Sequence, residues 1–415
     1  MASIRIGRPA QPEHPDVVRQ SSLRSLNLAI VTQRLFGASE PLSRADVAAD
    51  TGLTRSTVSR LVDDLIAGEL IEETPPQAFG QRGRPAVPLV PAGKTWVALG
   101  LEVNVGRMAA RLVDLAGHTR AEERVEVDLR NSDPAWVIEE LAALGRSVLS
   151  QAGTDVTLAG VQWAIPGLVD AERGTLLRAP NLGWWDVPAR ALLARALELD
   201  PSLIDVGNES DYAAQTVAWD APGRPSRREE FLYLSGEIGI GSSLVKAGGV
   251  VTGGHGWAGE IGHVCVDRNG PVCACGARGC LEVYVGSSAL HAWAGVPDTD
   301  ALLARIESRD ARACDAVNEA AAMLGVALAG ALNLLDVANV VLGGHLGRLL
   351  PAMRSGIEAE LRQRVVAAPF EAIGITAVPE ERDMPSLGAA YTALHRVLEH
   401  PAQWLTLGEI PGVWR

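Results

Sequence analysis

The stretch 256–284, GWAGEIGHVCVDRNGPVCACGARGCLEVY, contains four of the chain's five cysteines, one histidine and two glutamates. Cys273, Cys275 and Cys280 follow His263 by 10, 12 and 17 residues. Three thiolates and one imidazole are typical ligands of a tetrahedral zinc ion, and four protein ligands leave no position for water or substrate. We therefore expect one structural zinc ion per chain and no metal that takes part in chemistry.

A disulfide is the alternative use of these cysteines. The N-terminus has no apolar run of the kind found in secretory signals, so we expect a cytoplasmic protein with reduced thiols. Cys265 is a competing metal ligand beside His263, whereas Cys314 is interpreted as a small core residue of a helix. The longest apolar stretch, 320–332, is shorter than the ~20 residues that span a bilayer, and it predicts a buried helix and no membrane contact.

The charge distribution limits where nucleic acid could bind. The net charge of −13 argues against a chain that binds nucleic acid along its whole length. Residues 1–94, however, hold about 11 basic and 10 acidic side chains, so the negative excess lies beyond them. A DNA-binding module is therefore expected only at the N-terminal end.

Two closely spaced helix patterns occur in that region. The first, 43–50, begins with Ser43 as N-cap and Asp46 three residues later, which is a partial capping box. Gly52 permits a tight turn, and a second helix follows from Thr54. Its apolar face is formed by Val58, Leu61, Val62 and Leu65. The arrangement predicts a helix-turn-helix whose second helix enters the major groove.

The other face of the second helix carries donors suited to base edges and phosphates: Arg55, Ser56, Thr57, Ser59 and Arg60. Residues 70–73 and 86–90 are expected to be the strands of a wing, and Arg82 and Arg84 in its loop suit a narrow minor groove. A protein-interaction domain is the alternative. We favour DNA binding because the turn, the cap, the exposed donors and the wing agree.

Beyond residue 94 the sequence changes to apolar strands that alternate with helices, which indicates α/β layers. The expected strands include 96–103, 107–114, 160–165, 231–235 and 338–342. Glycine-rich loops follow several of them, at 166–167, 236–241 and 343–344, where ligand clefts of open α/β folds form.

The run Gly259-Glu-Ile-Gly-His263, followed by Cys-x-Cys-Gly-x-x-Gly-Cys-x-Glu at 273–282, resembles the signature of the ROK family of repressors, open reading frames and kinases. The resemblance covers nearly the whole chain, including 165–167, 179–182 and 386–390. It implies an α/β, actin-like, two-lobed sugar-kinase body with a structural zinc, a sugar between the lobes and an N-terminal winged helix-turn-helix domain.

The resemblance also implies which residues contact the sugar. Glu260, His263 and Glu282 would bind its hydroxyls, with one His263 nitrogen on zinc and the other on the sugar. Asn208 and Asn181 would add contacts, and Glu209 stands at the position of the kinase base. The alternative for each is an ordinary polar residue of a loop.

Two departures from the family kinases argue against catalysis. The kinases have an Asp-x-Gly-Gly-Thr phosphate loop, whereas residues 102–106 read Glu-Val-Asn-Val-Gly, with side chains where bare backbone is needed. Glu209 replaces the catalytic aspartate, and a misplacement of that size can cost on the order of 10²-fold in rate. We expect no catalytic residue and a sugar-responsive repressor of carbohydrate genes; an ATP-dependent sugar kinase with an accessory DNA domain is the alternative.

The expected partners are operator DNA, a sugar or sugar derivative, and further copies of the chain in a homodimer or tetramer. Sugar binding would move the lobes and change the spacing of two winged helices. We expect a flexible arm over 1–20, the DNA-binding domain over 21–94, the body over 95–400 and a tail over 401–415, whose tryptophans would pack on the body or on a partner.

Overall fold

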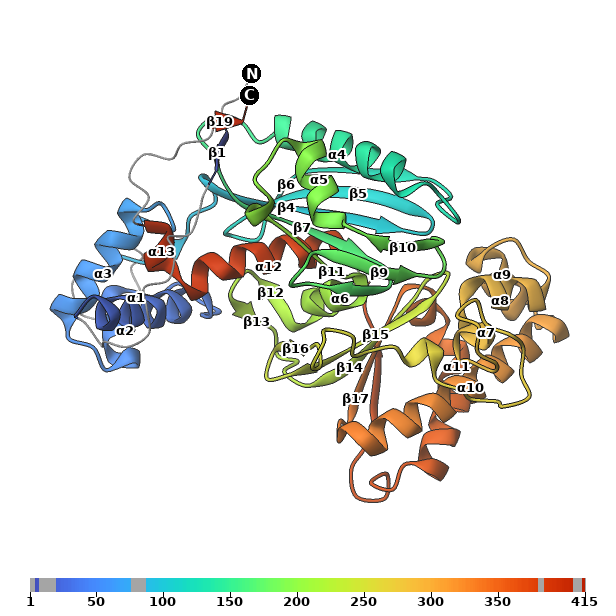
Figure 1. Cartoon of the computed structure of the whole chain (residues 1–415). Coiled ribbons are helices and arrows are strands. Elements are labelled where there is room, and N and C mark those ends of the chain that lie inside the picture. Colours follow the sequence, from blue (N-terminus) through green and yellow to red (C-terminus); the bar gives the residue numbers. More distant parts are fainter. Residues whose placement is uncertain (1–3, 7–19, 76–86, 380–383, 406–412, 415) are drawn as a thin grey trace.

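Figure 1 shows the computed structural model, which describes residues 4–6, 20–75, 87–379, 384–405 and 413–414. The predicted helix-turn-helix is present. It consists of α1 (Gln20–Phe36), α2 (Arg44–Thr51), α3 (Arg55–Ala67) and the antiparallel strands β2 (Ile71–Glu73) and β3 (Leu89–Pro91). The loop between β2 and β3 lies outside the described residues, so the DNA contacts of Arg82 and Arg84 remain predictions.

Local interactions set the limits of α2 and α3. The Ser43 hydroxyl accepts a hydrogen bond from Asp46 N, and the Asp46 carboxylate accepts one from Ser43 N, which completes the predicted capping box. Gly52 ends α2 with φ of 70°, a conformation that glycine adopts without strain. The four apolar residues predicted for the inner face of α3 are all buried.

The first lobe of the body is built on one sheet. Its main strands run in the order β6 (Thr119–Glu126), β5 (Arg107–Asp114), β4 (Trp96–Asn104), β7 (Thr157–Ile165) and β11 (Ile204–Asn208). β4, β5 and β6 are antiparallel, whereas β7 and β11 run parallel to β4. Helices α4 (Pro134–Ser150) and α5 (Ala189–Leu197) lie on one side of this sheet, and α12 (Pro385–Glu399) on the other.

The second lobe repeats this plan. Its sheet runs in the order β16 (Gly249–Val251), β15 (Ile240–Lys246), β14 (Phe231–Gly236), β17 (Asn339–Gly343) and β18 (Gly374–Ala377), with the same pattern of strand directions. Its helices are α7 (Glu282–Val285), α8 (Ser287–Ala294), α9 (Thr299–Glu307), α10 (Ala311–Leu335) and α11 (Gly344–Arg364). Helix α6 (Glu209–Ala218) contacts β14, β15 and α12, so it lies between the lobes. The repeated plan confirms the predicted two-lobed α/β fold.

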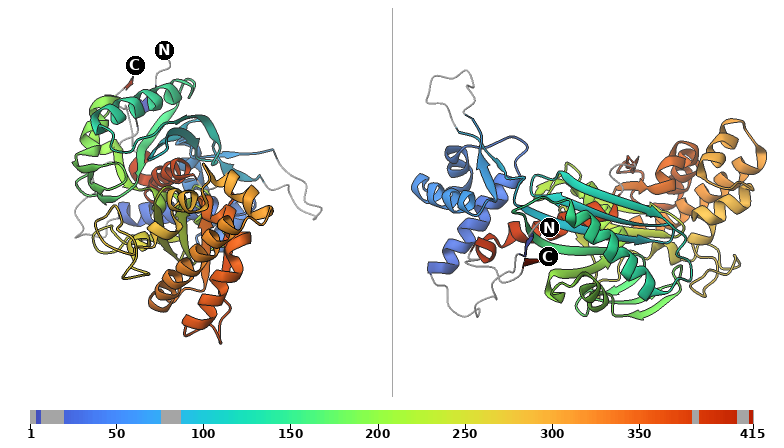
Figure 2. Two further views of the ribbon diagram at one scale, coloured as in Figure 1. Left: turned by 90° about the vertical axis from the view of Figure 1, so that its right-hand side faces the viewer. Right: turned by 90° about the horizontal axis from the view of Figure 1, so that it is seen from above.

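Short elements complete the described chain. They are β8 (Leu168–Asp170), β9 (Thr175–Ala179), β10 (Trp184–Val187), β12 (Trp219–Ala221), β13 (Arg224–Pro225), and the 3-10 turns Pro201–Leu203 and Ile261–His263. Figures 1 and 2 place the helix-turn-helix domain at one end of the molecule and α8–α10 at the other.

Helix α10 is longer than the predicted apolar stretch 320–332. At 25 residues it is long and apolar enough, by length and composition alone, to cross a membrane. Core helices of globular proteins meet the same criterion, and α10 buries one face in the core of the second lobe, against α11. The helix is therefore weak evidence for membrane contact.

The two ends of the chain differ from the predicted arm and tail. Ile4–Ile6 forms β1, which pairs with the start of β7 and with β19 (Val413–Trp414), so these residues belong to the first sheet and not to a free arm. The physical reason is an open edge: β11 pairs with β7 only from Val161 onward, which leaves earlier backbone groups of β7 to be paired. In the tail, Pro401–Leu405 forms α13, and Trp404 is buried against Trp96.

Candidate functional site

The predicted metal ligands meet at one point. One ligand atom from each of His263, Cys273, Cys275 and Cys280 lies within 4.8 Å of all the others. Cys275 Sγ is 3.7 Å from Cys280 Sγ, and Cys273 Sγ is 3.8 Å from His263 Nδ1. A tetrahedron with Zn–S bonds of about 2.3 Å has edges of about 3.8 Å. The donor set and its spacing therefore fit a four-coordinate metal ion.

The remaining cysteines lie apart from this group. Cys265 is exposed, although its backbone pairs with that of Cys280, and it is not part of the metal-ligand group among the described residues. Cys314 is half-buried on α10, and all five cysteines are free of disulfides. His263 directs Nδ1 at the cysteines and Nε2 toward Glu260, 3.9 Å from Glu260 Oε2. The imidazole thus faces both the metal-ligand group and the cleft.

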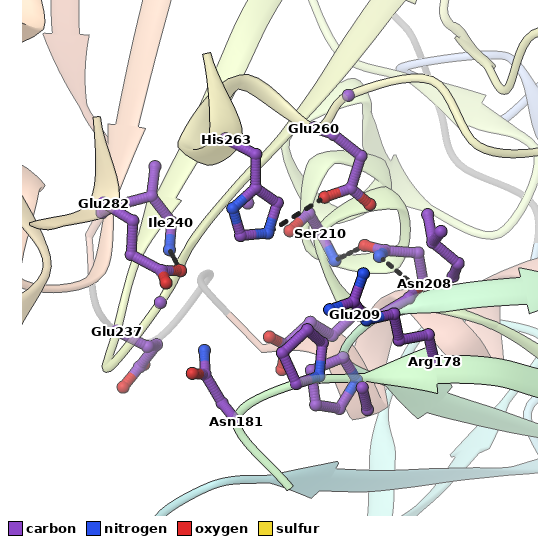
Figure 3. A pocket seen from close by; sticks show the side chains of 18 of the residues that line it. Arg178, Asn181, Asn208, Glu209, Ser210, Glu237, Ile240, Glu260, His263 and Glu282 are labelled. Atoms are coloured by element: carbon purple, nitrogen blue, oxygen red, sulfur yellow. Dashed lines mark hydrogen bonds and ion pairs between the residues drawn. The ribbon is translucent and has the colours of Figure 1, made fainter. Parts of the chain in front are cut away.

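A cleft of about 150 Å³ lies between the two lobes (Figure 3). Cavities of this volume accept a single six-membered ring. Of the predicted sugar contacts, Asn181, Asn208 and Glu209 line it from the first lobe and α6, and Glu260, His263 and Glu282 from the second lobe. The structure thus brings all six predicted residues together.

One glycine allows the walls of the cleft to approach each other. A Cβ atom on Gly239 would lie 2.7 Å from Glu282 Oε2 and 3.0 Å from Asn181 Nδ2. Glu282 Oε2 also accepts a hydrogen bond of 3.2 Å from Ile240 N, which orients the carboxylate (Figure 3). The glycine-rich loop predicted to line a ligand cleft therefore does so and leaves room for both side chains.

Asn208 and Glu209 stand at the start of α6, where the helix enters the cleft. Asn208 is the N-cap: its Oδ1 accepts from Ser210 N at 2.7 Å, and its Nδ2 donates to Gly167 O at 3.0 Å. Only one amide hydrogen and one lone pair of Asn208 therefore remain for a ligand.

The Glu209 carboxylate accepts a hydrogen bond of 2.7 Å from Asn104 Nδ2. Burial, together with the nearby charges of Glu102 and Glu237, raises the pKa of Glu209 to about 8, against the opposite effect of Arg107 and Asn104. At neutral pH this side chain is mostly protonated, which makes it a hydrogen-bond donor to the cleft.

Sequence reasoning missed three charged residues of the site. Glu237 and Arg178 line the cleft, and Arg107 pairs with Glu237 at 3.0 Å and with Glu102 at 2.7 Å. Arg178 Nη2 donates to Cys275 O at 3.1 Å and its guanidinium stacks on Trp185. The sequence signal for Glu237 was a charged residue inside the glycine-rich loop 236–241. No nearby residue in the sequence indicated that its partner is Arg107.

The outer face of α3, which is predicted to contact DNA, is exposed. Arg55, Ser56 and Arg60 are exposed, and Thr57 and Ser59 are half-exposed. The hydroxyls of Ser56 and Thr57 both lie within hydrogen-bonding distance of the Thr54 hydroxyl, so they also hold the N-terminus of the helix. In the described structure no acidic partner is recorded for Arg55 or Arg60, whereas Arg44 on α2 pairs with Asp63 and Glu73.

The fold and the site define a two-lobed, sugar-kinase-like body joined to a helix-turn-helix domain. The ROK family model matches residues 98–396 and the IclR helix-turn-helix domain model matches 34–75. The chain belongs to the ROK family.

Named relatives and solved structures agree with this assignment. A putative xylose repressor of Caldicellulosiruptor sp. (strain Rt8B.4) is 30% identical over 321 residues, which cover 73% of this chain and 79% of the relative. The crystal structure of a ROK family transcriptional regulator, a homolog of the E. coli MLC protein, matches with a TM-score of 0.73 and 22% identity over 92% of this chain and 99% of its own. The crystal structure of the ROK hexokinase from Thermus thermophilus matches with a TM-score of 0.58 and 27% identity, over 72% of this chain and 99% of its own.

Proposed function

We propose that this protein is a sugar-responsive, DNA-binding transcriptional regulator that holds a sugar in the interlobe cleft without phosphorylating it. One observation carries the proposal: a helix-turn-helix whose α3 exposes two arginines, with no acidic partner among the described residues, is joined to a body with a cleft of monosaccharide size. The name of the Caldicellulosiruptor relative, a putative xylose repressor, supports repression relieved by a pentose or a related sugar.

The nucleotide side of the cleft supports binding without phosphoryl transfer. The side chains of the stretch 102–107, which we equate with the kinase phosphate loop, are engaged in contacts within the protein: Asn104 donates to Glu209, and Arg107 pairs with Glu102 and Glu237. Glu237 also places a carboxylate in the glycine-rich loop, where a triphosphate would be repelled. The carboxylates of Glu237, Glu260 and Glu282 in the cleft also disfavour phosphorylated sugars, so the effector is an uncharged sugar.

The metal is zinc in a structural role. His263 and the three cysteines supply four donors of the type and number that closed zinc sites use, and the ion would order the loop 256–284 that carries Glu260 and Glu282. With Nδ1 on the metal, His263 Nε2 carries the ring proton and donates to a sugar hydroxyl, and the two carboxylates accept from neighbouring hydroxyls.

The protein acts as a homodimer or tetramer, because two recognition helices at a fixed spacing read the two half-sites of a symmetric operator. Light scattering coupled to size exclusion would measure the mass in solution. A monomer at micromolar concentration, with or without DNA, would contradict this part of the proposal.

Operator binding and its response to sugar test the regulator directly. A labelled fragment from upstream of the protein's own gene is titrated at fixed salt, with and without common pentoses, hexoses and amino sugars. We expect at least one uncharged sugar to change the affinity about 5-fold or more, within the usual range of allosteric coupling. The same sugar should raise the melting temperature of the protein by mass action, and its phosphorylated form should not. A protein that binds this DNA equally with every sugar would contradict the proposal.

A sugar kinase is the second candidate, because Glu209 lines the cleft and could accept the proton of an attacking hydroxyl. A coupled assay with ATP and the sugars that stabilise the protein separates the two functions. Turnover above about 1 s⁻¹ would support the kinase and contradict a pure regulator.

A further inference from the structure

We propose that Arg107 is a positioning residue that transmits sugar binding from the cleft to the DNA-binding domain, through an ion-pair network with Glu102 and Glu237. This inference rests on the proposed function. We call these three residues the interlobe network: Glu102 and Arg107 belong to β4 and β5 of the first lobe, and Glu237 follows β14 of the second lobe.

The geometry of the interlobe network joins the lobes at the cleft. Arg107 Nε donates to Glu102 Oε1 at 2.7 Å, and Arg107 Nη1 donates to Glu237 Oε1 at 3.0 Å. The side chains of Arg107 and Glu102 are 14% and 3% exposed, whereas that of Glu237 is 35% exposed and lines the cleft. Glu237 is thus the member that a sugar hydroxyl can reach. A hydroxyl that donates to Glu237 changes how strongly this carboxylate holds Arg107.

The buried end of the network contacts α12. Glu102 Oε2 accepts a hydrogen bond of 3.2 Å from Ser386 N, in the first turn of α12. β4 and α12 approach closely here, because a Cβ atom on Gly100 would collide with Ser386 O. A movement of the Glu102 carboxylate therefore has to displace the start of α12 or break this hydrogen bond.

The other end of α12 lies against the DNA-binding domain. Leu394, Val397 and Leu398 of α12 share one buried apolar cluster with residues of α1 and α3. Leu398 and Phe36 of α1 both lie against Gly223, where a Cβ atom would be 2.7 Å from Leu398 Cδ1 and 3.0 Å from Phe36 Cβ. Because a helix moves as a rigid element, displacement at Ser386 reaches α1, which sets the position of α3.

The coupling also depends on the side-chain geometry of Arg107. Arginine bonds two carboxylates at once through a planar fork, and a lysine at this position keeps the charge but not the fork. The predicted outcome of Arg107→Lys is therefore partial loss of coupling in a folded protein.

The experiment separates sugar affinity from coupling. Operator affinity is measured without sugar and at saturating sugar, using the sugar that shifts the wild type most, in Glu237→Gln, Arg107→Lys and the double variant. We expect the ratio of the two operator affinities to fall to within about twofold of one in Glu237→Gln, with a smaller fall in Arg107→Lys and no further fall in the double variant. The control, Glu230→Gln, removes a second-lobe carboxylate that pairs with Lys246 and does not line the cleft, and its ratio should stay that of the wild type.

The outcomes distinguish this inference from the proposed function. A wild-type protein whose operator affinity does not respond to any sugar contradicts the proposed function itself. The other outcome is a wild type that responds, with Glu237→Gln and Arg107→Lys variants that melt cooperatively and respond in full at saturating sugar. This outcome overturns the role of Arg107 and leaves the proposed function standing.

Discussion

At the scale of single residues, several carboxylates surround one buried guanidinium beside the cleft. Glu102, Glu209 and Glu237 lie near Arg107, and full ionisation would leave a net negative charge in a poorly solvated place. Burial is the main cause of the raised pKa of Glu209, about 8, and relief of the repulsion from Glu102 and Glu237 adds to it. A protonated carboxylic acid at the start of α6 is suited to hold a sugar hydroxyl and ill suited to act as a base at neutral pH.

The raised pKa of Glu209 predicts a pH-dependent stability. Between about 4.5 and about 8 the folded protein keeps a proton that the unfolded chain has released, so stability due to this group falls as pH rises through that window. Glu209→Gln cannot ionise, and its melting temperature should exceed that of the wild type by a few degrees at pH 8.5 but not at pH 4.5. Glu172→Gln, at an exposed loop position, is the control. An equal difference at both pH values would show that Glu209 is ionised in the fold.

The metal-ligand group gives a second prediction at this scale. Cys275→Ser removes one of four ligands, and a closed site rarely keeps its ion with three. We expect metal content to fall from about one zinc per chain to well below it, with new protease cleavage in the loop 256–284. Cys265→Ser, a cysteine outside the group, should keep the zinc. Loss of zinc from Cys265→Ser, or its retention in Cys275→Ser, would require a different ligand set.

At the scale of elements, the parts that were predictable are those set by neighbours in sequence. The capping box at Ser43, the turn at Gly52, the buried face of α3 and the strand 107–114 depend on residues a few positions apart, and the structure confirms each. The metal-ligand group was predictable for the same reason. The pair Arg107–Glu237 was not, because 130 residues separate its members and only the stacking of two lobes brings them together. The backbone pairing of β1 was missed because its partner strand gives no local signal.

The position of α3 predicts the effect of its arginines on DNA binding. Arg55→Ala and Arg60→Ala should each weaken operator binding by about 10-fold, and each should reduce the slope of log affinity against log salt by about 1 where the contact is to phosphate. Because both side chains are exposed and have no acidic partner among the residues that the structure describes, the melting temperature should stay unchanged. Lys94→Ala removes a charge from an 83% exposed side chain outside α3 and serves as control. If neither arginine variant binds more weakly than Lys94→Ala, α3 is not the recognition helix.

At the scale of the whole molecule, the DNA-binding domain and the first lobe share one apolar core. This cluster includes Leu28 and Val31 of α1, Val58 of α3, Trp96 of β4 and Trp404 of α13. Trp96 also donates from Nε1 to Gly68 O at 2.9 Å, at the end of α3. A continuous core of this kind resists independent movement of its parts, so a displacement of the first lobe would carry α3 with it.

Removing Trp404 tests whether this shared core transmits the signal. The ring lies 5.8 Å from that of Trp96, nearly perpendicular to it, and is 5% exposed, so Trp404→Ala should cost about 3–5 kcal/mol through the cavity that it leaves. We expect the single unfolding transition to split, with the DNA-binding domain melting first. Calorimetry should show sugar still binding the body, while operator affinity no longer responds to it. Trp136→Ala, at a 46% exposed site on α4, should keep one transition and the full response. A Trp404→Ala protein that melts as one unit and responds to sugar would mean that α12 alone, through its contact with α1, is sufficient to join the two domains.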